Sequence, residues 1–231
     1  MKLTLIGVYG PYPAPGSGCS SYLVEDGETK ILLDCGSGSL SRYRALFSGD
    51  LDLDAIVLSH MHTDHAGEID LFRYMLEFGH GNTPLRVFSP ETGRLCYPVF
   101  DPVQTTDGTK TVVGSLVLQF FAVRHAVPTV GVRITDADGH SLVYTGDTGL
   151  FDGLSHAVRG VDLLLADACL WDESNPKAMR NHMTVKQVEA LAKDASVKRA
   201  VLTHRFGDAP DDLPAVEPPC EYAVEGAVYE I

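Results

Sequence analysis

The stretch His60-Met61-His62-Thr63-Asp64-His65 places four candidate metal ligands within six positions. It follows a nearly all-apolar run at residues 55–59, typical of a buried strand, and precedes a helical pattern. A tight turn between the two can aim imidazoles and a carboxylate into one space. Zn²⁺ is commonly held by imidazole nitrogen and carboxylate oxygen. The alternative is a polar loop with accidental clustering, which nine histidines in 231 residues make improbable.

Other short apolar runs also end in a residue that binds metal or titrates. The runs are residues 116–123, 141–145, 162–166 and 200–203, and the residues that follow them are His125, Asp147, Asp167 and His204. Because ligands in layered α/β folds gather at one end of a sheet, we expect one shared rim. Taken alone, His125 and His204 fit ordinary core or surface histidines, and Asp147 fits a turn residue.

The remaining patterns predict a β-rich start, several helices and a last strand. Strands are expected at residues 2–8, 21–24, 30–33 and 223–230, and a solvated loop at residues 207–221. Apolar residues at helical spacing predict helices at residues 40–47 and 69–76. The clearest helix begins at Thr184, where Thr184-Val185-Lys186-Gln187 has the form of a capping box.

Composition fits one globular α/β domain over residues 1–231, 45% apolar. With 18 Lys and Arg against 31 Asp and Glu, the formal charge of −13 disfavours a broad nucleic-acid surface. Any anion must therefore be attracted locally.

Five cysteines without a C-x-x-C pair argue against a disulfide framework and a zinc ribbon, so we expect a reducing, cytoplasmic location. No apolar run approaches the roughly 18 residues that a membrane span needs. We therefore expect no membrane partner.

The sequence resembles the metallo-β-lactamase superfamily, whose His-x-His-x-Asp-His signature precedes a lone His, a bridging Asp and a final His. His60, His62, Asp64 and His65 match the signature, and His125, Asp147 and His204 match the later positions in order. The likeness runs from residue 2 to about residue 206. It implies a four-layer αββα sandwich with metals at one edge.

The resemblance also implies two Zn²⁺ ions, with manganese or iron as alternatives. It assigns His60, His62 and His125 to one ion and Asp64, His65 and His204 to the other, with Asp147 and a hydroxide between them. Asp64 would also orient that nucleophile.

Within the superfamily, the middle of the chain is most similar to ribonuclease Z and its short relatives. Three features carry this likeness: His125-x-x-Pro128-x-x-Gly131-x-Arg133, Ala166-Asp167-Ala168 and His182-Met183-Thr184. Asp167 could hold one tautomer of His182, which would suit a general acid or a phosphoryl-binding cation. The alternatives are a loop carboxylate and an exposed histidine at a helix start.

Two departures from ribonuclease Z restrict the expected substrate. Only 22 positions separate His125 from Asp147, too few for the tRNA-binding arm, and residues 9–29 contain no Lys or Arg. Since basic phosphate contacts dominate RNA affinity, we expect a small anionic substrate and no long nucleic acid. Homodimers are common among the relatives, so a homodimer is also expected.

The sequence therefore predicts a dinuclear zinc phosphodiesterase that uses a metal-bridging hydroxide. Hydrolysis of carboxylic esters, thioesters or lactones on the same ligands is the second enzyme class. A non-hydrolytic metal-binding protein, or a di-iron redox centre, is the third. Redox relatives usually carry Glu where His62 stands, so the imidazole favours zinc.

Overall fold

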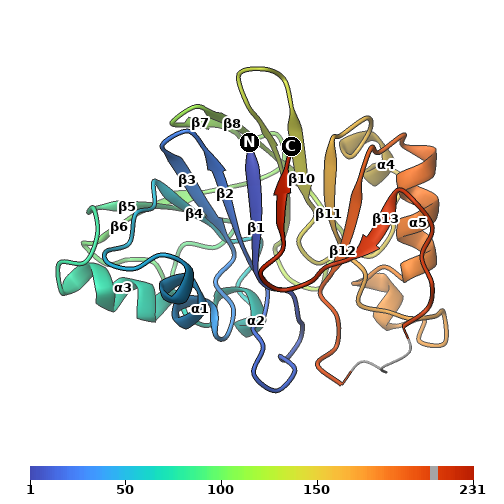
Figure 1. Ribbon diagram of the computed structural model, residues 1–231, viewed down its shortest axis with the longest axis horizontal. Helices are drawn as coiled ribbons and strands as arrows, with labels where there is room; N and C mark the ends of the chain where they lie inside the picture. Colours follow the sequence, from blue (N-terminus) through green and yellow to red (C-terminus); the bar gives the residue numbers. More distant parts are fainter. Residues whose placement is uncertain (209–212) are drawn as a thin grey trace.

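Two seven-stranded sheets form the centre of the computed structural model, which describes residues 1–208 and 213–231 (Figure 1). In order, the first sheet contains β14 (Val228–Glu230), β1 (Lys2–Gly7), β2 (Ser21–Asp26), β3 (Thr29–Leu33), β4 (Ala55–Val57), β5 (Leu85–Ser89) and β6 (Phe100–Gln104). In order, the second contains β13 (Cys220–Tyr222), β12 (Ala200–Thr203), β11 (Leu163–Asp167), β10 (Ser141–Tyr144), β9 (Val130–Thr135), β8 (Leu116–Ala122) and β7 (Lys110–Val113).

Helices cover the outer face of each sheet. The first sheet carries α1 (Ser39–Leu46), α2 (Thr63–Ala66) and α3 (Ile69–Glu77), and the second carries α4 (Leu154–Ala157) and α5 (Val185–Asp194) (Figure 1). A 3₁₀ turn at Ala178–Arg180 precedes α5. No helix among the described residues is both long enough and apolar enough to cross a membrane.

Three apolar layers hold the four structural layers together. Tyr22 and Tyr144 meet between the sheets, with ring centroids 5.2 Å apart. Phe72 of α3 is fully buried under the first sheet, and Val188 of α5 is fully buried under the second. Since burial of large apolar side chains dominates folding, these layers explain the αββα sandwich, which confirms the expected fold.

Most predicted elements are present, and the exceptions follow from long-range pairing. The last strand is confined to β14, because the chain turns at residues 224–227 before pairing with β1. The prediction of a loop over residues 207–221 was wrong at its end, because Cys220 belongs to β13 and pairs with Ala200 of β12. Its residues 209–212 lie outside the described part. Strands β5, β6, β7 and β9 were not predicted.

Candidate metal centre

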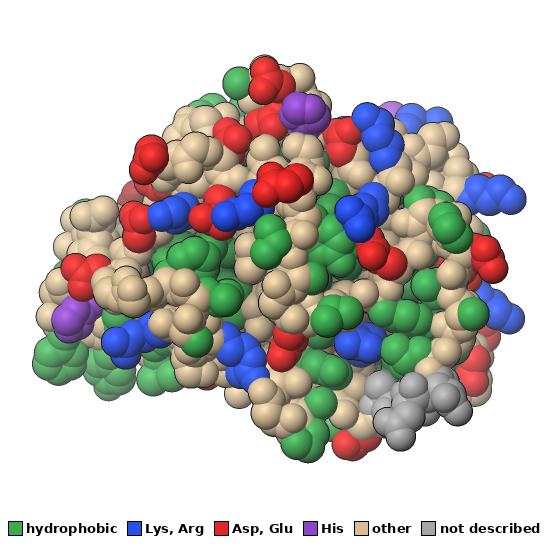
Figure 2. Space-filling view, in the orientation of Figure 1, with side chains coloured by type: hydrophobic (Ala, Val, Ile, Leu, Met, Phe, Trp, Pro, Cys, Tyr) green, Lys and Arg blue, Asp and Glu red, His purple; other side chains and the backbone are tan. Residues whose placement is uncertain are grey.

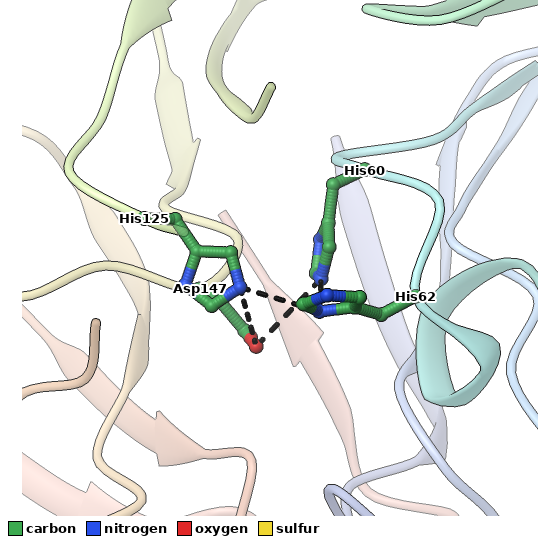
Figure 3. A group of neighbouring side chains, drawn as sticks. All are labelled: His60, His62, His125 and Asp147. Atoms are coloured by element: carbon green, nitrogen blue, oxygen red, sulfur yellow. Dashed lines mark hydrogen bonds and ion pairs between the residues drawn. The ribbon is translucent and has the colours of Figure 1, made fainter. Parts of the chain in front are cut away.

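Four of the predicted ligands converge at the rim between the two sheets. Figure 3 shows the side chains of His60, His62, His125 and Asp147 pointing toward one another, with His60 and His62 on one loop and the other two on separate loops. One ligand atom from each lies within 4.8 Å of the others. His62 Nδ1 is 2.9 Å from His60 Nε2 and 3.3 Å from His125 Nε2. Three nitrogens and one carboxylate oxygen are therefore gathered at one point.

A second group, formed by Asp64, His65, Asp147 and His204, adjoins the first and shares Asp147. His204 Nε2 lies 3.1 Å from Asp64 Oδ2, and His65 Nε2 lies 3.1 Å from Asp147 Oδ1. Within Asp147, Oδ1 faces this second group, whereas Oδ2 lies 3.8 Å from His60 Nε2 in the first. One carboxylate thus offers one oxygen to each group.

Local structure explains how the motif points inward. His62 is extended, with φ −63° and ψ 151°, and is the N-cap of α2, so the chain turns sharply there. Asp64 and His65 then lie within the first turn of α2, where both are buried. His204 follows β12 with a φ of 61°, a left-handed conformation that is uncommon for a residue with a side chain.

The outer ring nitrogens of His60 and His125 have partners outside the two groups. Ser59 Oγ lies 3.0 Å from His60 Nδ1, and His125 Nδ1 donates to the Asn181 carbonyl oxygen at 3.2 Å. Such contacts fix the ring orientation and leave the other nitrogen free to bind a cation.

Asp34 is a site residue that the sequence analysis missed. It is fully buried directly after β3, with a φ of 55°, and its Oδ2 lies 2.7 Å from His65 Nδ1. Ser59 Oγ and Tyr144 OH donate to the same oxygen at 2.8 and 2.6 Å. The available signal was its place at a strand end, the same pattern that identified His125 and Asp147.

Asp167 and His182 form a pair beside the second group, as predicted. Asp167 Oδ2 lies 2.9 Å from His182 Nδ1 and accepts a hydrogen bond from the Thr148 backbone N–H. The other oxygen accepts from the Cys169 backbone N–H and lies 3.7 Å from His204 Nδ1. Asp167 is therefore a buried carboxylate and not a loop residue, and His182 is half-buried at the site.

The charges of the site favour cations. Burial opposes ionisation of Asp147, but His204, His65 and His60 outweigh it and hold its pKa well below the usual range. Burial also holds the pKa of His60 well below that of a free histidine, so this imidazole is neutral and can donate a lone pair. For His182, the carboxylates of Asp167 and Asp147 outweigh burial and raise the pKa to about 9.

Buried polar atoms without a hydrogen-bond partner indicate whether metal ions fit the site. His65 Nε2 and Asp147 Oδ1 are buried and without a hydrogen-bond partner, although buried polar atoms normally have one. Both belong to the second group, whose donors are imidazole nitrogens and carboxylate oxygens. That donor set suits a divalent ion such as Zn²⁺, so the residues fit the metal centre that the resemblance implies.

A cavity of about 290 Å³ opens onto these groups. Both ligand groups and His182 reach its surface, and Cys169 is buried in its wall. Pro11 belongs to the loop between β1 and β2, so this loop borders the cavity.

Comparison with known proteins identifies the family. The model of the Beta-lactamase superfamily domain matches residues 29–205, so the chain belongs to this superfamily. The uncharacterized protein ML1173 of Mycobacterium leprae is 33% identical over 222 residues, covering 88% of this chain and 77% of that protein.

Two further relatives indicate the kind of protein. The probable metallo-hydrolase YhfI of Bacillus subtilis is 29% identical over 88% of this chain and 86% of its own length. Its crystal structure superposes with a TM-score of 0.87 over 99% of this chain and 98% of that one, at 27% identity. Ribonuclease Z of Mycobacterium bovis is 27% identical over 88% of this chain and 85% of its own length. These comparisons support a metallo-hydrolase of the β-lactamase superfamily.

Proposed function

We propose that the protein is a dinuclear zinc hydrolase that cleaves small phosphodiesters. The observation that carries this proposal is the position of Asp147, whose two oxygens face two different ligand groups. His60, His62 and His125 would hold one ion, and Asp64, His65 and His204 the other. When bound, two such ions lower the pKa of a shared water and polarise a phosphoryl oxygen.

The protein's own side chains supply the rest of the chemistry. Asp64 Oδ2 lies between His65 Nε2 and His204 Nε2, at 3.5 and 3.1 Å, where it can accept a proton from the attacking water. His182, protonated and held by Asp167, can donate a proton to the leaving alkoxide or a hydrogen bond to a phosphoryl oxygen. Manganese or iron would use the same ligands.

Two observations favour a phosphodiester of small size. The pair of His182 and Asp167 is suited to protonating an alkoxide leaving group, and ribonuclease Z is among the relatives. None of the described residues that line the cavity is Lys or Arg, so a long polyanion would find no cationic track there.

Hydrolysis of an acyl ester, thioester or lactone is the second candidate, because the same ligands serve it. Parallel assays of purified protein on bis(p-nitrophenyl) phosphate and on acyl esters and lactones separate the two classes. We expect turnover of the phosphodiester. Turnover confined to the acyl series would overturn our first choice, and tight metal binding without any turnover would favour a non-hydrolytic protein.

The metal assignment is tested by metal analysis of wild type and Asp147→Ala. We expect two zinc equivalents in wild type, and loss of at least one equivalent and nearly all turnover in the variant. The matched control is Asp138→Ala, an exposed carboxylate on the turn between β9 and β10. Retained metal and turnover in Asp147→Ala would contradict the shared role of this carboxylate.

Partners and location are also proposals. The five cysteines are unpaired, which supports the reducing conditions of a cytoplasm. A homodimer is proposed from the resemblance alone, and light scattering on the purified protein would check it.

A further inference from the structure

The cavity has an apolar part that the proposed metal ligands and the proton donor do not use. The apolar residues that reach it are Pro11, Ala126, Leu170, Ala178 and Phe206. Phe206 and Leu170 are the large ones, and Phe206 lies two residues after the ligand His204. A substrate bound through its phosphoryl group at the rim would therefore place another part of itself near these side chains.

The loop between β1 and β2 is distant in sequence from Phe206, but it contacts the Phe206 ring and the neighbouring residues. The ring of Tyr12 meets it edge-on, with centroids 6.4 Å apart and planes at 62°. Tyr12 OH in turn donates to Asp208 Oδ2 at 2.9 Å, which ties the first loop to the segment that carries Phe206. The Gly10 backbone N–H also donates to the Arg205 carbonyl oxygen at 2.9 Å. The aromatic surface is therefore largely pre-formed.

Two arginines that adjoin cavity-lining residues in sequence have partners outside the cavity. Arg205 precedes Phe206, but its Nη2 donates to the Ala223 carbonyl oxygen at 3.0 Å, and its guanidinium lies over the Tyr9 ring. Arg124 precedes His125, and its Nη1 is directed to the Leu150 carbonyl oxygen at 3.4 Å. Neither guanidinium lines the cavity, so Phe206 and Leu170 are the large side chains that a bound group would meet there.

We propose that Phe206 and Leu170 determine specificity by binding an aromatic group esterified to the phosphate. This proposal rests on the proposed function and adds the class of its substrate. Aromatic rings pack favourably edge-on or offset against one another, and a pre-formed surface reduces the entropic cost of binding.

Phosphonates test the proposal directly, because they carry one organic group and are not hydrolysed. Isothermal titration calorimetry on the zinc-loaded protein compares phenylphosphonate with methylphosphonate. We expect phenylphosphonate to bind at least about five-fold more tightly, as burial of part of one ring predicts. In Phe206→Ala the ratio should fall to about one, while the affinity for methylphosphonate stays within about two-fold.

Further variants and ligands separate an aromatic contact from a change in folding. Phe206→Leu keeps an apolar side chain and should retain an intermediate ratio. Tyr12→Phe, the matched control, loses the hydrogen bond to Asp208 but keeps the ring contact, and should retain most of the ratio.

The possible outcomes distinguish this proposal from the proposed phosphodiester hydrolysis on which it rests. An unchanged ratio in Phe206→Ala, or equal affinities in wild type, would overturn the aromatic contact while leaving phosphodiester hydrolysis intact. Failure of both phosphonates to bind the zinc-loaded protein, with no turnover of bis(p-nitrophenyl) phosphate, would overturn both proposals together.

Discussion

Asp34 Oδ2 lies 2.7 Å from His65 Nδ1, and both side chains are fully buried. The contact places a proton on Nδ1, so Nε2, which lies 3.1 Å from Asp147 Oδ1, is the nitrogen that would bind a metal ion. Because Asp34 follows β3 and His65 lies in α2, this pair joins the carboxyl end of β3 to the second ligand group. A buried carboxylate of this kind orients a metal ligand and raises its basicity.

We expect Asp34→Asn to weaken metal binding about 10- to 100-fold, the usual cost of losing such a partner. The amide removes the negative charge, and its N–H₂ group can force the proton of His65 onto Nε2. Chelator competition with a chromogenic indicator measures the affinity. Asp52→Asn is the control, since Asp52 is 72% exposed and forms an ion pair with Lys30. Equal affinities in the two variants would contradict the orienting role.

We expect the activity to fall as pH rises through the pKa of His182. The Asp167 and Asp147 carboxylates outweigh burial and raise this pKa to about 9, so the ring is a proton donor below that value. In Asp167→Asn the stabilising charge is lost, and the alkaline limb of kcat/KM should move to lower pH. The substrate should have an alkoxide leaving group, which needs protonation.

Two controls accompany this pH profile. Asp172→Asn, at an exposed position, should leave the limb in place. A p-nitrophenolate leaving group needs little protonation, so its turnover should fall less in the His182→Ala variant than that of the alkoxide substrate. Equal losses for both substrates would contradict a proton-donating role.

We expect Gly10→Ala to disturb the metal centre although no metal ligand is substituted. A Cβ at position 10 would overlap the imidazole of His204, which cannot retreat because it lies between Asp64 and Asp167. The variant should lose about one metal equivalent and most turnover. Gly93→Ala is the matched control, because the space around Gly93 is open. Full metal content in Gly10→Ala would contradict this expectation and show that the loop carrying residue 10 shifts to accommodate the methyl group.

We expect Thr184→Ala to lower the free energy of unfolding by roughly 0.5–2 kcal/mol, the usual value of an N-cap. Thr184 Oγ1 accepts from the Gln187 backbone N–H, and the Gln187 side chain accepts from the Thr184 backbone N–H. Urea denaturation measures the change. Thr184→Ser keeps the hydroxyl and should retain most of the stability, whereas similar losses in both would assign the effect to packing.

Local pattern alone determined several features of this protein. The motif from His60 to His65 places its ligands within one turn, so short-range geometry suffices to bring them together. The capping box at Thr184 is likewise local, and the structure contains both of its hydrogen bonds. Apolar runs predicted strands β4, β10, β11 and β12, whose residues are all buried, because burial on both faces requires apolar side chains throughout.

Only the tertiary structure decided which distant residues meet. Asp34 gave the same strand-end signal as other residues, yet its contact with His65 depends on β3 and β4 pairing in parallel. Strand β6 contains Asp101 and Pro102, so its sequence gives little sign of a strand until β5 pairs with it. The contact between Tyr12 and Phe206 likewise joins segments from opposite ends of the chain. Such contacts depend on the packing of whole layers, which periodicity within one segment does not encode.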